Sequence, residues 1–251
     1  MPMCRWVAPL VAGVFLFAAG TGASAQDIFV TPVPGAPFTG TIRVERTLGV
    51  QGGPAAVLQT VRGIGRDSQG RIYTESRALV PQGTNVLPIL TRVLIYDPQT
   101  RTSTVIDPRR RTYRSFVVRR PPATEPPNAL YASPDSPPLS PYTREEELGT
   151  RQMMSLSVHG VREIQTIPDP SGNGQNITVT DDYWYSDALH MNLALRHSDP
   201  RTGTVTMVVT DLSLAEPDPS RFQVPDGYTD MAHAPAAPPN QPAQPSPAPQ
   251  P

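Results

Sequence analysis

Residues 191–214 read MNLALRHSDPRTGTVTMVVTDLSL and hold the clearest signal of fold in this chain of 251 residues. Apolar residues occur at every second position in two sets: Met191, Leu193 and Leu195, and then Val205, Met207 and Val209. Successive side chains of a strand point to opposite faces, so this alternation predicts two half-buried antiparallel strands. The intervening Asp199-Pro200-Arg201-Thr202-Gly203 is typical of a tight turn. The stretch therefore predicts a β-hairpin.

The same alternation continues outward through the chain. Further strands are expected at residues 42–48, 57–64, 71–78, 92–97, 102–107, 111–118, 153–167 and 177–186. Asp67-Ser68-Gln69-Gly70 favours a hairpin turn, and Asp97-Pro98 repeats the turn chemistry of Asp199-Pro200. We expect some nine antiparallel strands in one all-β domain, residues 39–231.

One short helix is expected beside these strands. Thr143-Arg144-Glu145-Glu146 has the form of a capping box, and Gly149 can end a helix, so residues 143–148 predict one or two helical turns. The acidic residues 145–147 are interpreted as its solvated face. A β-bulge is expected at Gly160 because the alternation changes phase there.

The start of the chain has the pattern of a secretory signal peptide. A short apolar run follows Arg5, and Ala23-Ser24-Ala25 suits signal peptidase, so residues 1–25 are expected to be removed before Gln26. Residues 26–38 are expected to form a linker. Since Cys4 is the single cysteine, the mature chain is cysteine-free. We predict a periplasmic or secreted protein with no transmembrane segment after cleavage.

Composition excludes one class of partner. All 21 basic residues are arginine, and the net charge is −1, whereas nucleic-acid binders normally carry a basic excess. Many of the 32 prolines lie in an insertion at residues 120–142 and in a tail at 232–251. Neither segment has apolar periodicity, so both are expected to be disordered.

No catalytic or metal-binding constellation stands out. The histidines are His159, His190, His197 and His233, and no two are placed at ligand spacing, so no metal and no cofactor are expected. Asp181 and Asp182 could act as an acid–base pair. However, neighbouring strand residues face opposite sides of the sheet, which separates their carboxylates. No catalytic residue is therefore assigned.

Aromatic residues are the candidates for ligand binding. Trp184 is expected on one face of its strand, with Tyr183 and Tyr185 on the other. Tyr113 and Phe116 lie among the arginines of residues 109–120, which could border an anionic ligand or keep an edge strand from pairing. The predicted ligand-binding residues are Tyr113, Phe116, Trp184 and Tyr185.

Two resemblances follow from specific motifs. Tyr183-Trp184-Tyr185-Ser186, Asp199 to Gly203, and Glu216 to Tyr228 with its Glu-Pro-Asp-Pro and Phe-Gln-Val-Pro-Asp-Gly-Tyr resemble an uncharacterised family of exported bacterial proteins. Leu94-Ile95-Tyr96-Asp97-Pro98 and the late Phe-x-x-Pro-x-Gly-Tyr are similar to the outer-membrane lipoprotein carrier (LolA-like) group. The second resemblance implies a single strongly curved sheet or half-barrel whose concave face shelters apolar ligands such as acyl chains.

Three functions remain open from sequence. The first is an exported, non-enzymatic module that binds an apolar ligand or lipid on a curved sheet. The second is an envelope structural or interaction protein that contacts other envelope proteins through its proline-rich arms. The third is a hydrolase using Asp181 and Asp182. An apolar sheet face wider than the core requires would favour the first.

Overall fold

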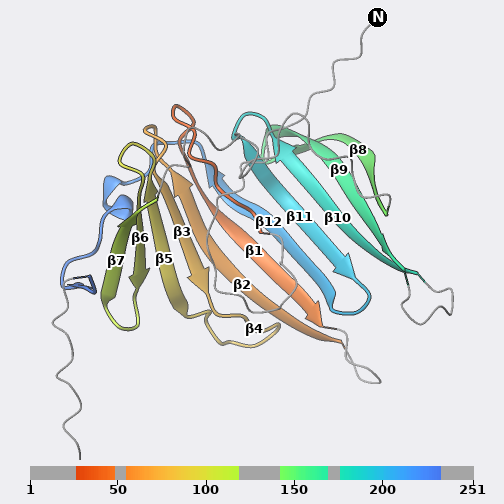
Figure 1. The fold of residues 1–251 in the computed structure, drawn as a ribbon, viewed down its shortest axis with the longest axis horizontal. Helices are drawn as coiled ribbons and strands as arrows, with labels where there is room; N and C mark the ends of the chain where they lie inside the picture. Colours follow the sequence, from red (N-terminus) through yellow and green to blue (C-terminus); the bar gives the residue numbers. More distant parts are fainter. Residues whose placement is uncertain (1–26, 49–54, 119–141, 169–175, 233–251) are drawn as a thin grey trace, which may run out of the picture.

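The computed structural model describes residues 27–48, 55–118, 142–168 and 176–232, which form one large, curved, open sheet (Figure 1). Thirteen strands make up this sheet. They are β1 Phe38–Leu48, β2 Ala56–Arg66, β3 Ile72–Arg77, β4 Val80–Pro81, β5 Leu90–Asp97, β6 Thr102–Asp107, β7 Thr112–Val117, β8 Thr143–Met153, β9 Leu156–Ile167, β10 Ile177–Ser186, β11 Met191–Asp199, β12 Gly203–Ser213 and β13 Thr229–Asp230. The all-β, mainly antiparallel fold expected from sequence is thus confirmed.

The strand order is β13-β7-β6-β5-β3-β2-β1-β12-β11-β10-β9-β8, with β4 paired to β2. Chain neighbours therefore pair within two meanders, β1–β7 and β8–β12. The two meanders meet where β1 pairs antiparallel with β12, for example Ile42 with Val209. The two-residue strand β13 pairs parallel with β7.

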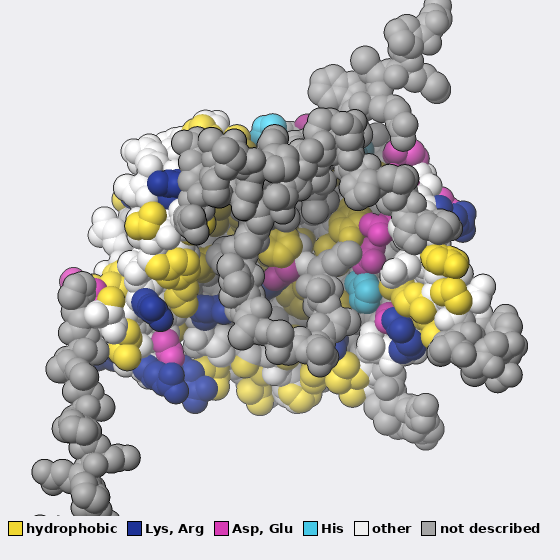
Figure 2. Space-filling model, viewed as in Figure 1, with side chains coloured by type: hydrophobic (Ala, Val, Ile, Leu, Met, Phe, Trp, Pro, Cys, Tyr) yellow, Lys and Arg dark blue, Asp and Glu magenta, His cyan; other side chains and the backbone are white. Residues whose placement is uncertain are grey.

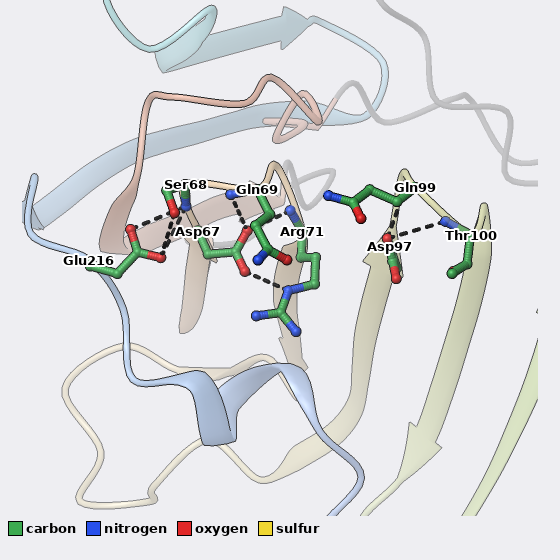
Figure 3. A network of polar contacts seen from close by, with 8 residues as sticks. All are labelled: Asp67, Ser68, Gln69, Arg71, Asp97, Gln99, Thr100 and Glu216. Atoms are coloured by element: carbon green, nitrogen blue, oxygen red, sulfur yellow. Dashed lines mark hydrogen bonds and ion pairs between the residues drawn. The ribbon is translucent and has the colours of Figure 1, made fainter.

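Aspartates shape the tight turns as the sequence indicates. Asp67 accepts hydrogen bonds from the amides of Gln69 (3.0 Å) and Arg71 (2.8 Å), which closes the β2–β3 turn (Figure 3). Asp97 accepts in the same way from the Gln99 amide at 2.8 Å (Figure 3). Asp199 accepts from the Arg201 amide at 2.8 Å. Asp97-Pro98 and Asp199-Pro200 therefore use one turn chemistry.

The first hydrophobic core lies on one side of the sheet, which we call the Ile42 face. Residues directly opposite in an antiparallel pair share a face, and the partners Val44, Met207 and Leu195 form such a row across β1, β12 and β11. All three are buried, as is Ile42. Ile28, from the segment before β1, joins this cluster at 3% exposure.

The second core lies on the opposite side, which we call the Tyr73 face. Tyr73 pairs with Ile95, and Ile95 packs with Val93, Ile106 and Phe222 in a separate cluster. Phe222 belongs to the C-terminal segment and ends the 3-10 helix η2, Pro219–Phe222. Glu216 ties this segment to the β2–β3 turn by accepting from the Ser68 amide at 3.1 Å (Figure 3).

The helix expected at residues 143–148 is wrong. Thr143–Met153 is strand β8, which pairs with β9 along its length. The capping-box pattern is a local preference, and the hydrogen bonds offered by the free edge of β9 override it. Gly149 has φ +80° and lies at a register shift in β8, opposite Gly160, so the irregularity expected at Gly160 is located on the partner strand.

Several expectations lie outside the described residues, namely the signal peptide at residues 1–25 and nearly all of the proline-rich insertion and tail. Residues 27–37, expected as linker, place Ile28 in the first core. No helix within the described ranges is long and apolar enough to cross a membrane.

Candidate functional site

Strands β5 and β6 carry apolar residues on both of their faces. Their Tyr73-face residues Val93, Ile95 and Ile106 are buried in the second core. On the Ile42 face, the direct partners Leu94 and Val105 are only half-buried. Figure 2 shows hydrophobic side chains on the visible side in several patches, separated by charged and other side chains. Apolar side chains of the Ile42 face therefore extend beyond the first core, onto β5 and β6.

A surface depression of about 610 Å³ adjoins this half-buried surface at β6 and β7. Its lining residues are Val105, Asp107, Arg110, Thr112, Tyr113, Arg114, Phe116 and Met231. Register puts Val105, Arg114 and Phe116 on the Ile42 face. Phe116 is 45% exposed and therefore offers apolar area to a ligand. Two of the residues predicted from sequence line this depression, Phe116 from the Ile42 face and Tyr113 from the opposite face, where it packs against the second core.

Trp184 and Tyr185 lie elsewhere, on β10. The Arg151 guanidinium lies 3.6 Å from the centre of the Trp184 ring, and the ring covers Gly160 of β9. The Tyr185 ring contacts His159, with 5.3 Å between ring centres. Burial raises the pKa of Tyr185 above its ordinary value. The four predicted ligand-binding residues therefore do not form a single site.

Asp181 and Asp182 have separate partners, as their opposite faces require. Asp181 lies 2.7 Å from Nδ1 of His197. Asp182 accepts two hydrogen bonds from Arg162, at 2.6 and 2.8 Å. A carboxylate held by a guanidinium is a poor proton carrier, so the two aspartates do not form an acid–base pair.

A row of charged residues crosses β8–β11 on the Ile42 face. The register partners Glu145, Glu163, Asp181 and His197 follow one another across the four strands. Burial, together with the charges of Asp181 and Glu145, raises the pKa of Glu163 above its ordinary value. This row marks the polar end of a face that is apolar at its centre.

Across the described ranges, no three His, Cys, Asp or Glu side chains are placed to hold an ion. His190 occupies the turn before β11, with φ 52°, whereas His197 lies on β11. The turn rather than strand alternation separates these two histidines.

Sequence reasoning missed two arginines of the Ile42 face. Arg66 is fully buried and donates to the backbone carbonyls of Thr31 (2.8 Å), Ala36 (2.8 Å) and Leu189 (3.0 Å). Burial lowers its pKa to about 10. Arg62 pairs with Asp27, from the segment before β1. Residues 62, 64 and 66 of β2 point to the same face because side chains alternate along a strand. The apolar Ile64 between the two arginines therefore indicated that both point toward the core side.

No protein-family profile matches this sequence, and no curated protein matches it. Solved structures do show similarity. The MucA/MucB complex of Pseudomonas aeruginosa matches at 12% identity and a TM-score of 0.36, over 74% of this chain and 55% of that one. MucB alone matches at 10% identity and a TM-score of 0.38, over 77% of this chain and 59% of that one. This chain thus spans less than two thirds of either.

A LolA superfamily protein from Nitrosomonas europaea is also similar, at 8% identity and a TM-score of 0.29. This match covers 76% of the present chain and 91% of that protein. Lipoprotein LppX of Mycobacterium tuberculosis matches at 14% identity and a TM-score of 0.27, over 71% of this chain and 88% of that one.

Proposed function

We propose that this protein is an exported, non-enzymatic module that shelters an apolar or amphipathic ligand on the Ile42 face of its sheet. The observation that carries the proposal is the two-sided apolar character of β5 and β6. The second core already uses their Tyr73 face, so the half-buried Leu94 and Val105 and the exposed Phe116 serve something other than the folding of that core.

The size and chemistry of the depression suit such a ligand. Its volume of about 610 Å³ falls in the range of small-molecule sites. Val105 and Phe116 supply apolar surface, while Arg110 and Arg114 supply donors at its border. Each methylene that leaves water contributes about 0.8 kcal/mol before the cost of association, so a shallow apolar groove can hold an acyl chain.

Two neighbouring substitutions test the proposal. Phe116→Asp places a charge on the Ile42 face, whereas Val117→Asp places one on the opposite face of β7, at a residue that is even more exposed (63%). We expect Phe116→Asp to abolish the fluorescence enhancement of a lipophilic dye and Val117→Asp to retain it. Circular dichroism checks that both variants are folded.

Equal binding by the two variants, or no binding of dye or lipid by the wild-type protein, would reject the proposal. The second outcome would favour the envelope interaction protein. The proline-rich arms of that alternative lie almost wholly outside the described residues.

A further inference from the structure

Residues 27–30 lie on the Ile42 face and cover part of the first core. Ile28 is 3% exposed and Val30 packs against the same cluster, whereas Phe29 between them is 48% exposed. Two apolar side chains therefore point to the sheet and one points away from it. We call residues 27–30 the strap.

The strap begins with an ion pair on the sheet surface. Arg62 donates from Nη1 to Asp27 Oδ2 at 2.8 Å and from Nη2 to Oδ1 at 2.5 Å, which is a bidentate arrangement. Arg62 is 13% exposed and its Nη2 also lies 3.6 Å from the Met207 sulfur. The Asp27 carboxylate thus binds the Arg62 guanidinium at the margin of an apolar surface, and the next residue, Ile28, is buried in that surface.

Two buried polar atoms beside this ion pair have no hydrogen-bond partner in the described part of the chain: Arg62 Nε and Thr60 Oγ1. Thr60 is 4% exposed and shares the Ile42 face with Arg62. A buried donor without a partner carries a free-energy cost. Asp27 therefore does not satisfy the Nε donor of Arg62 or the hydroxyl of Thr60.

Within the described residues, the strap is held most firmly at its C-terminal end. Beyond it, fully buried Arg66 holds the Thr31 and Ala36 carbonyls, and the Thr31 hydroxyl donates to the His190 carbonyl at 2.6 Å. On the other side of this anchor, the strap itself is held by one ion pair and two aliphatic side chains. Release of Asp27 can therefore free the strap while Arg66 keeps the rest of the segment in place.

Between Arg62 and the depression, the Ile42 face carries the buried Ile64, then Thr74, and then the half-buried Leu94 and Val105. Ile64, next to Arg62 on the same face of β2, begins a register row with Thr74, Leu94 and Val105. This row crosses three strand spacings of about 4.8 Å, roughly 14 Å, which an extended long-chain acyl group spans.

We propose that Arg62 is the anion subsite for the carboxylate of a long-chain amphiphile, and that Asp27 and Ile28 occupy this subsite in the ligand-free protein. The proposal rests on the proposed function and adds the ligand class. A planar guanidinium matches a planar carboxylate in two parallel hydrogen bonds, the geometry that Asp27 already displays. Thr60 Oγ1 offers a further donor beside it.

The test compares palmitate with hexadecanol, which has the same chain length and no charge, on the full exported protein. Arg62→Gln should weaken palmitate binding about tenfold and leave hexadecanol binding within about twofold, because one charge-assisted bidentate pair is lost. Asp27→Asn should strengthen palmitate binding severalfold because it removes the competing carboxylate. Arg43→Gln, an exposed arginine on the other face of β1, should change neither affinity.

Loss of both ligands to the same extent in Arg62→Gln would overturn the proposal, as would unchanged palmitate binding in Arg62→Gln or in Asp27→Asn. If Arg62→Gln does not fold, the palmitate-to-hexadecanol affinity ratio of Asp27→Asn decides, and a ratio equal to that of the wild type rejects the subsite. Failure of the proposed function itself has a different signature, namely that the wild-type protein binds neither ligand.

Discussion

The two halves of the sheet use opposite faces for their cores. Strands β1, β2 and β9–β12 bury Ile42, Leu193 and Leu195 on the Ile42 face, while β3 and β5–β7 bury Ile95 and Ile106 on the Tyr73 face. Each half has its own cover, because Ile28 comes from the segment before β1 and Phe222 from the segment after β12.

This difference explains why one face remains available. In the first half, the strap and the turn residue Leu189 pack onto the apolar side. In the second half, the C-terminal segment occupies the Tyr73 face, so the apolar residues of the Ile42 face stay half-exposed. In the described part of the chain, an open sheet that changes its core face along its width therefore keeps apolar side chains such as Leu94 and Val105 half-exposed.

The largest effect should come from the first core. Phe38 is fully buried, and the Arg66 guanidinium lies 5.2 Å from the centre of its ring. Phe38→Ala should lower the free energy of unfolding by about 4–5 kcal/mol, through lost burial and the cavity left behind. Phe29→Ala, at a half-exposed position of the strap, should change it by about 0.5 kcal/mol or less. Denaturant unfolding measures both, and similar losses would contradict the assigned core.

A smaller and local effect should follow in the second core. Phe222 is 7% exposed and is supplied by the C-terminal segment, so Phe222→Ala should cost about 3 kcal/mol. We expect faster hydrogen exchange in β5 and β6 and unchanged protection in β10–β12, because the cores are separate clusters. Uniform loss of protection would show that the two halves unfold as one unit.

Gly160→Ala tests the packing of β9 against β10. A Cβ at this position would lie 2.8 Å from Cζ3 of Trp184, so the ring must move. We expect a cost of about 1–2 kcal/mol and a shifted tryptophan emission. Gly40→Ala is the control, since its nearest neighbour is Val209 Cγ1 at 3.3 Å and not an indole. Unchanged emission in Gly160→Ala would contradict the stacked arrangement.

The smallest effect is electrostatic. The pKa of Glu163 is raised in the folded protein by burial and by Asp181 and Glu145, so its ionised form disfavours folding at neutral pH. Glu163→Gln should therefore raise the melting temperature at pH 7. The gain should disappear as the pH falls below the ordinary glutamate value of about 4.3, where the carboxyl is protonated in both states. Glu146→Gln, at a residue paired with Arg144, should show no such gain.

Local patterns predicted most of the strands and turns correctly. The alternation of Met191 to Val209 placed β11 and β12, and the aspartates of the turns act on backbone amides two residues away. These contacts join residues only a few positions apart, which are close in space whatever the rest of the chain does. The error at residues 143–148 arose because a capping pattern says nothing about a free strand edge elsewhere in the chain.

The sequence by itself determined the strand content, the turn chemistry and the opposite faces of Asp181 and Asp182. Only the tertiary structure decided that β1 joins β12, that the core changes face across the sheet, and that Asp27 meets Arg62. Contacts between residues 35 to 169 positions apart produce no periodic pattern in the sequence. Alternation shows that a strand has two faces, but it does not show which face is packed against another segment.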